Sequence, residues 1–140
     1  MADGEHVLSV AEFATVSPEG YLVPKRGPFP VQMAKSQGTA LPLIEIKSGL
    51  GVDLIHFKAG EGVAMHVHPG AHILNVFSGE GELDYYDQTY PLRAGMVYRI
   101  CSQEPHAVHA SLTSDEGMTI QVIGNDHRPA DSSERLDLVE

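Results

Sequence analysis

The chain is 140 residues long, which is typical of one domain with a single hydrophobic core. It has 9 Lys and Arg residues against 19 Asp and Glu residues, for a formal net charge of -10. Such a surface repels phosphate backbones and anionic lipid, so the composition argues against nucleic acid and membranes as partners. No apolar run approaches the roughly 20 residues of a membrane span, no signal peptide is recognisable, and one cysteine cannot form an internal disulfide. We therefore expect a cytoplasmic protein.

The first part of the chain, residues 1–42, is predicted to be an arm outside the main body. Residues 9–12 fit a helix capping box, so residues 9–15 are expected to form one or two helical turns. Prolines and glycines then interrupt the sequence repeatedly, and proline is tolerated only where its missing donor does no harm. This pattern predicts a wrapping arm with short edge strands around residues 31–34.

Residues 43–124 are predicted to form the main body from many short strands. Helical periodicity is nearly absent, and turn signals recur at close spacing, which favours a sandwich or barrel over alternating strands and helices. Besides a strand that carries His66, the expected strands cover residues 43–47, 51–57, 71–78, 82–86, 89–92, 96–101, 106–112 and 118–123. For the strand over 51–57 both faces carry apolar residues, so either face could look inward.

The last part of the chain, residues 125–140, is polar and acidic. We expect a loosely held tail with a terminal helical turn after residue 133. Its apolar residues Leu136, Leu138 and Val139 are candidates for docking on a neighbouring subunit.

Three histidines lie within seven residues, at positions 66, 68 and 72. In a strand the side-chain period of two places His66 and His68 on one face. A Pro-Gly turn follows, and the next strand places His72 on a common face with Leu74 and Val76. Neutral imidazole suits transition metals, and buried histidines without a metal would lose hydration and repel one another once protonated. The pattern therefore predicts a metal site.

The same segment resembles the first motif of the cupin superfamily. That motif runs Gly, five residues, His-x-His, three or four residues, Glu, six residues, Gly. Gly60, His66, His68 and Gly79 are in register with it, and His72 stands where the glutamate is usual.

The second cupin motif contributes one more histidine after a turn that contains glycine. Gly95 and His106 match it, whereas Cys101, Gln103 and Ala110 replace its Pro, second Gly and final Asn.

The resemblance implies an all-β fold, a double-stranded β-helix or jelly-roll barrel, as a single domain with an N-terminal arm. It also implies a four-histidine site that holds one divalent transition metal, with Fe, Zn, Ni, Cu and Mn as candidates. The implied ligands are His66, His68, His72 and His106. By the same resemblance we expect a homodimer in which N-terminal strands are exchanged.

Three further residues are candidates for the site. Tyr98 and Tyr85 could act as acid, base or hydrogen-bond donor to a substrate, although core packing is the favoured alternative. His56 could contact substrate, but a hydrogen-bonded structural or surface role is the favoured alternative.

The implied function is that of a metal-dependent enzyme acting on a small organic molecule. The leading hypothesis is a dioxygenase-type oxidoreductase of a chelating enol or diketone, because four histidines leave coordination positions open for substrate and dioxygen. A non-redox cyclase, isomerase, lyase or decarboxylase, in which the metal stabilises an enolate, is an alternative. A module that binds a small ligand without turnover is the third.

Overall fold

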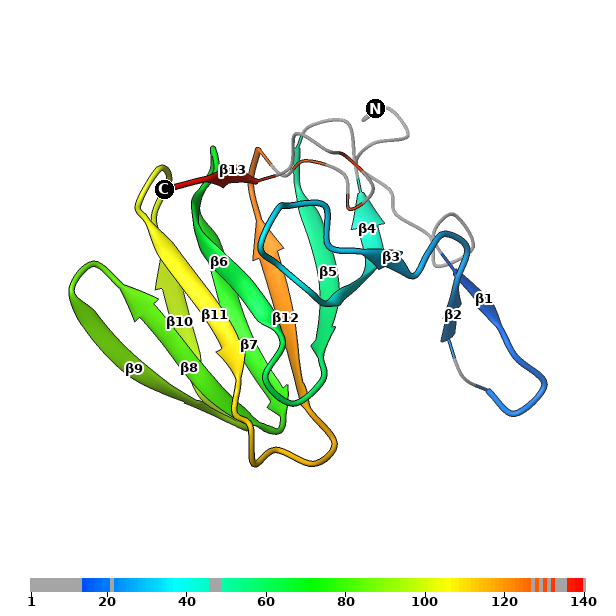
Figure 1. The fold of residues 1–140 in the computed structure, drawn as a ribbon. Coiled ribbons are helices and arrows are strands. Elements are labelled where there is room, and N and C mark those ends of the chain that lie inside the picture. Colours follow the sequence, from blue (N-terminus) through cyan, green and yellow to red (C-terminus); the bar gives the residue numbers. More distant parts are fainter. Residues whose placement is uncertain are drawn as a thin grey trace.

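The computed structural model describes residues 14–20, 22–45, 49–126, 128, 130, 132 and 136–139. All regular elements in these residues are β-strands, and their pairings are antiparallel (Figure 1). The all-β prediction is confirmed. Within this part of the chain there is no helix that is long and apolar enough to cross a membrane.

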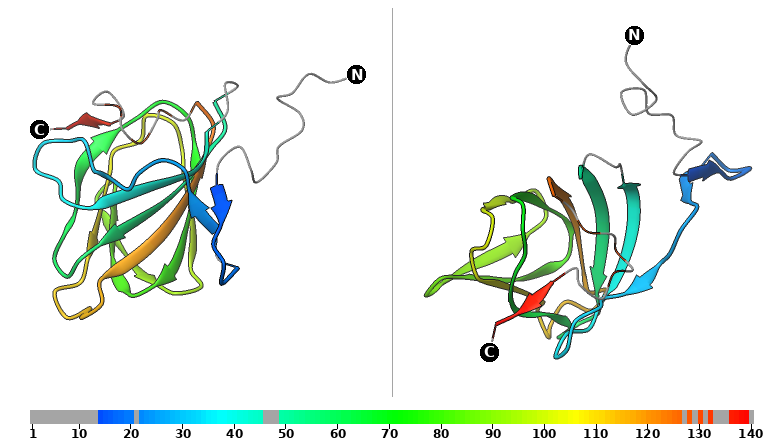
Figure 2. Two further views of the ribbon diagram at one scale, coloured as in Figure 1. Left: turned by 90° about the vertical axis from the view of Figure 1, so that its right-hand side faces the viewer. Right: turned by 90° about the horizontal axis from the view of Figure 1, so that it is seen from above.

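Two sheets form the body of the molecule, and Figure 2 shows them facing each other. The first has, in spatial order, β10 (Val97–Ile100), β7 (His72–Ser78), β12 (Met118–Gly124), β5 (Gly51–Phe57), β4 (Thr39–Glu45) and β3 (Phe29–Pro30). The second has β13 (Asp137–Leu138), β6 (Gly62–Val67), β11 (His106–Ala110), β8 (Glu80–Tyr85) and β9 (Gln88–Arg93). A separate hairpin, β1 (Ala14–Val16) and β2 (Leu22–Pro24), projects to one side.

The core lies between the two sheets, where alternate side chains of strands such as β5 and β12 are buried. In β7 the side chains of Leu74 and Val76 are buried, whereas Ile73 and Phe77 are 44% and 53% exposed. This agrees with the predicted His72 face. In β5 the inward face carries the fully buried Phe57, which resolves the orientation that the sequence left open. Other core residues are Ile55, Leu83, Val108, Met118, Ile120 and Val122.

A β-bulge interrupts the pairing of β6 with β11. His66 pairs with His106, but Val63 pairs with Val108, so three steps along β6 match two along β11. The extra residue lets both Val63 and His66 point into the core, where they are 7% and 4% exposed. Bulges of this kind redirect side chains next to functional sites.

The N-terminal arm differs from its prediction in two respects. Residues 14 and 15 belong to strand β1 rather than to a helix, while residues 9–13 lie outside the described residues. Residues 31–34 form no strand, and the short edge strand is β3 instead. Proline at position 30 fits the outermost position in the sheet, since an edge strand tolerates the missing donor.

The loop after β3 fastens the arm to β6. The amide of Gln37 donates to the carbonyl of Gly62 at 2.9 Å, and the amide of Ala64 donates to Oγ of Ser36 at 3.0 Å. The arm thus covers the edge of β6. Strand β4 spans the boundary placed between arm and barrel after residue 42, and this boundary stays a prediction.

The tail is attached to its own chain where the structure describes it. Strand β13 pairs with the end of β6, with Leu138 opposite His66, and the amide of Val139 donates to the carbonyl of Met65 at 2.8 Å (Figure 1). Leu136 packs against the core. The expectation of a loose tail is therefore wrong for residues 136–139, and a helical turn there is replaced by a strand. Residues 133–135 lie outside the described part.

Candidate metal centre

Three histidines converge inside the barrel, at the end where β6 finishes and β11 begins. His66 lies on β6, His68 follows that strand directly, and His106 is the first residue of β11. They are 4%, 8% and 2% exposed. Each offers a ring nitrogen that lies within 4.8 Å of those of the other two. Three buried histidines could therefore bind one metal ion.

Hydrogen bonds to the backbone orient these rings. Nδ1 of His66 lies 2.8 Å from the carbonyl oxygen of Ala64, and Nδ1 of His106 lies 2.8 Å from that of Glu104. Nδ1 of His68 lies 3.2 Å from the carbonyl oxygen of Pro69. A carbonyl only accepts, so in the neutral ring Nδ1 carries the proton and Nε2 keeps its lone pair. This is the tautomer that a metal ligand needs.

Burial also favours the neutral form of His106. The pKa of His106 is lowered from 6.5 to about 4, mainly because burial disfavours the charged ring. The hydrogen bond to the Glu104 carbonyl raises this pKa by a smaller amount, and the nearby His68 lowers it. A neutral imidazole is the form that binds a metal. His106 is thus ready to act as a ligand at neutral pH.

His72, at the start of β7, approaches the same point from the opposite sheet. Its ring centroid lies 4.4 Å from that of His68 and 5.5 Å from that of His106. It is less buried than the other three and lies outside the group whose ligand atoms are mutually within 4.8 Å. The structure thus brings together the four histidines that the sequence singled out, three of them more closely.

The spacing of the ring nitrogens can be compared with that of bound ligands. Three nitrogens bound to one ion at about 2.1 Å lie about 3.0–3.4 Å apart in octahedral or tetrahedral geometry. The ring nitrogens of the three histidines lie within 4.8 Å of one another. Binding one ion would therefore draw the three rings closer together. The donor set is nitrogen only, which suits Zn, Fe, Ni or Cu better than Mg or Ca.

The turn between His68 and His72 is held from two sides. The amide of Gly70 donates to Oγ of Ser102 at 3.1 Å, and that of Ala71 donates to Oδ1 of Asn125 at 2.8 Å. Gly70 has a φ of +79°, and a Cβ there would lie 1.9 Å from the carbonyl oxygen of Asn125. Only glycine fits this close approach. The turn therefore fixes the spacing of the two histidines.

A cavity of about 60 Å³ adjoins the four histidines. This is room for a few water molecules or for a small ligand. The lining is mostly apolar, and apart from the histidines its polar side chains are Asn125, Asp126 and Arg128. The apolar lining residues are Val31, Ala40, Ile55, Phe57, Val63, Pro69, Ala71, Leu74, Val108, Ile120, Val122, Ala130 and Leu136, and two glycines complete it.

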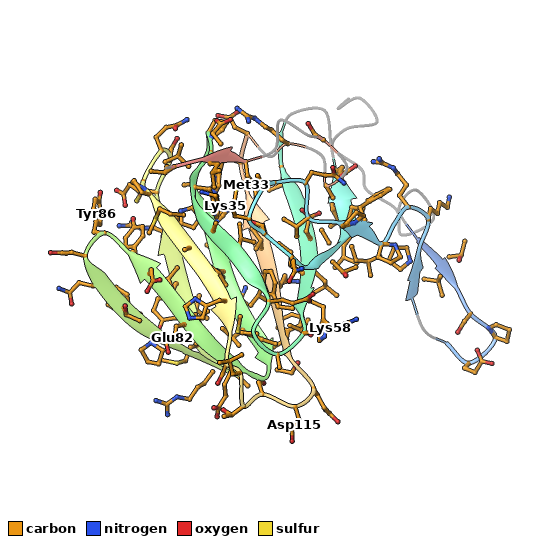
Figure 3. All side chains as sticks on the ribbon, viewed as in Figure 1. Met33, Lys35, Lys58, Glu82, Tyr86 and Asp115 are labelled. Atoms are coloured by element: carbon orange, nitrogen blue, oxygen red, sulfur yellow. The ribbon has the colours of Figure 1, made fainter. Side chains whose placement is uncertain are left out.

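The structure does not bring the other three candidates into this cavity. His56 lies on the outer face of β5, where Nδ1 is 2.8 Å from Oγ1 of Thr119. The hydroxyl of Tyr98 donates to the carbonyl of Pro91. Tyr85 pairs with His106 in register, but its ring packs against the core and against Tyr86, which Figure 3 shows at the outer end of the β8–β9 hairpin.

Sequence reasoning missed Asn125, Asp126 and Arg128, because the tail was treated as a loose polar segment. The polar run directly after the last long strand was the available signal. A chain that leaves a barrel strand beside the histidines places its next side chains at the cavity.

Comparison with known families shows to which family the chain belongs. The family model of the cupin domain matches residues 53–123, just over half of the 140 residues. The chain belongs to the cupin family. The matched span contains all four histidines of the site. No curated protein matches the sequence with significance.

Solved cupin structures resemble this one in fold. A cupin-like protein from Thermotoga maritima has 23% identity and a TM-score of 0.59, with 66% of this chain and 71% of that chain covered. A DMSP lyase from Ruegeria pomeroyi has 19% identity and a TM-score of 0.60, with 73% and 51% covered. Salicylate 1,2-dioxygenase from Pseudoaminobacter salicylatoxidans has 18% identity and a TM-score of 0.58, with 69% and 26% covered. At these identities the likeness shows the fold alone, and it confirms the jelly-roll prediction.

Proposed function

We propose that this cupin is a metal-dependent enzyme acting on a small organic molecule, with dioxygenase-type oxidation of a chelating enol or diketone as its leading reaction. The observation that carries the proposal is the convergence of three buried imidazoles whose Nδ1 atoms lie against backbone carbonyls. The Nε2 atoms of these imidazoles are the proposed ligand atoms of a cation beside the cavity. The proposed setting is the cytoplasm.

The proposed ligands are His66, His68, His72 and His106, and the proposed ion is one divalent transition metal among Fe, Zn, Ni, Cu and Mn. Such an ion supplies Lewis acidity and, if redox-active, a path for electrons to dioxygen. Four neutral ligands leave its positive charge uncompensated, which favours an anionic substrate oxygen.

The rest of the chain shapes the space in which the reaction occurs. Apolar side chains such as Ile55, Leu74 and Val122 line the cavity and lower its polarity, which strengthens electrostatic interactions inside. The bulge in β6 and the Gly70 turn hold the histidines in place, so the ligands need little reorganisation.

A non-redox reaction is the second candidate, as a cyclase, isomerase, lyase or decarboxylase that stabilises an enolate. Asp126 favours it, because among the described residues it is the one carboxylate lining the cavity and could accept a proton from carbon. The cupins of similar fold carry names of both kinds, a lyase and a dioxygenase. A binding module without turnover is the third candidate.

Elemental analysis of protein purified without added metal is the first test. We expect close to one transition-metal ion per chain, and iron with oxygen uptake during turnover supports the dioxygenase reaction. Zinc together with anaerobic turnover contradicts it and favours the non-redox alternative. Protein that binds none of the five metals tightly contradicts the proposal as a whole.

A matched pair of variants on β11 shows whether the histidine cluster is the site. His106 points into the barrel, whereas the side chain of His109 is 43% exposed. We expect His106→Asn to lose most of the bound metal and His109→Asn to keep it. Equal metal content in both variants places the metal elsewhere.

A further inference from the structure

One positive charge lies beside the histidine cavity. Arg128 is the only Lys or Arg among the described residues that line it. It follows β12 and precedes Ala130, which is 1% exposed and whose amide donates to the Glu45 carboxylate at 3.2 Å. Described residues before and after Arg128 are therefore attached to the barrel.

Arg128 also differs from the other described cations in its burial. Its side chain is 32% exposed, so it lies where the cavity meets solvent. The other described cationic residues, Lys25, Arg26, Lys35, Lys58, Arg93 and Arg99, are exposed. In a chain with a net charge of -10, a half-buried cation at a cavity is unlike the rest of the surface.

Two acidic residues of the described part of the chain bear on the charge of Arg128, namely Asp137 and Asp126. Nη1 of Arg128 lies 3.6 Å from Oδ2 of Asp137, whose side chain is 55% exposed. An ion pair of this length with a solvent-exposed partner is weak. Asp126 lines the cavity too, but it is exposed, and water screens its charge. A guanidinium has five donors in a plane and can hold a carboxylate in addition to Asp137.

We infer that the substrate of this cupin carries a carboxylate that the guanidinium of Arg128 binds at the mouth of the histidine cavity. Its short apolar body lies against the aliphatic wall that includes Val63, Val108 and Leu136. This inference rests on the proposed function and narrows its substrate class to small carboxylic acids. Arg128 is thus a specificity-determining residue.

The test uses butanoate and butanamide, which have similar shape and differ in charge, and measures their binding to the metal-loaded full chain by calorimetry. We expect wild type to prefer butanoate by about 10- to 100-fold, as for a charge-assisted hydrogen-bonded pair. Arg128→Gln is expected to lose this preference. Arg99→Gln, which removes an exposed positive charge on β10, is expected to keep it.

Two further variants separate recognition from a structural role of Arg128. Arg128→Lys keeps the charge without the planar pair of donors and is expected to bind butanoate with intermediate affinity. Asp137→Asn removes the competing carboxylate, so butanoate should bind it at least as tightly as wild type. If Asp137→Asn loses binding as Arg128→Gln does, Arg128 only holds the tail and the inference is wrong.

Metal content is measured in parallel in every variant. If wild type holds metal but Arg128→Gln still prefers butanoate, or if wild type shows no preference, the carboxylate inference fails and the proposed function stands. If wild type holds no metal, the proposed function fails first.

Discussion

His66 and His106 lie directly opposite each other on the paired strands β6 and β11, with ring centroids 4.2 Å apart. The two side chains also share a hydrogen bond pattern, because each Nδ1 lies 2.8 Å from the carbonyl oxygen two residues earlier. Strand register and ring orientation thus act together. A slip of one residue between these strands would turn one imidazole out of the barrel.

Among the four proposed ligands, His72 is the one whose contribution most needs a test. We expect His72→Ala to weaken metal binding by about tenfold or more, which corresponds to about 1.4 kcal/mol per factor of ten. The three closer histidines should still bind the ion. His72→Glu should restore most of the affinity, because a carboxylate is also a ligand for these metals. Competition with a chromogenic chelator measures the metal affinity of wild type, His72→Ala and His72→Glu. If His72→Ala binds metal as tightly as wild type, His72 is not a ligand.

Metal-free protein should lose stability as the pH falls. The pKa of His106 is lowered to about 4 in the folded state, so between pH 6.5 and 4 only the unfolded chain takes up this proton. The contribution of neutral His106 to the free energy of unfolding is therefore fully present above pH 6.5 and is lost as the pH falls toward 4. Its size is roughly 2–4 kcal/mol. Urea unfolding at a series of pH values measures the slope.

The variant His106→Asn should show a shallower pH dependence than wild type in the same range. His109→Asn is the control, since water reaches its side chain, which is 43% exposed. If His106→Asn and wild type lose stability in parallel, groups other than His106 carry the acid sensitivity.

The sequence predicted the strands and the histidine cluster because both depend on local pattern. Alternation placed Leu74 and Val76 inward together with His72, and motif spacing brought in the distant His106. The bulge in β6 could not be predicted, since its extra residue is defined only by pairing with β11. Strict alternation from Val63 would have turned Met65 inward and His66 outward.

The pairing of the tail with β6 and the polar residues that line the cavity were not predicted, for a related reason. Residues 125–140 were predicted to be a loosely held polar end, but strand β13 pairs with the edge of β6. Such long-range pairing is not encoded in a short window. For Tyr98 the favoured interpretation was core packing, and the structure agrees with it, because Tyr98 packs against the core and its hydroxyl donates to the Pro91 carbonyl.

Gly70 should be more sensitive to substitution than another glycine of similar backbone conformation. Gly70 and Gly95 have φ values of +79° and +89°, but a Cβ at Gly95 meets nothing within 4 Å. Gly95→Ala should therefore cost only the left-handed conformation, about 1–2 kcal/mol. Gly70→Ala adds a clash with the Asn125 carbonyl, and we expect a total of about 3 kcal/mol or more.

Metal affinity gives a second measurement for the same pair. Because the Gly70 turn sets the spacing of His68 and His72, Gly70→Ala should weaken metal binding beyond its effect on folding, whereas Gly95→Ala should not. Equal losses of unfolding free energy in urea, with equal metal affinities, would show that the close approach to Asn125 does not position the ligands.

We predict that the chain forms a homodimer through its N-terminal strands. The β1–β2 hairpin is a two-stranded sheet apart from the two main sheets, and an isolated hairpin is marginal in water, so a partner subunit would stabilise it. Light scattering of the full chain should give twice the mass of the monomer. Val23→Asp, at a β2 side chain that is 46% exposed, should shift the protein toward monomer. Leu112→Asp adds the same charge at an 84% exposed side chain of a distant turn and should leave the dimer intact. A monomeric full chain refutes the prediction. If the Val23→Asp variant is still a dimer, the dimer interface does not include the β1–β2 hairpin.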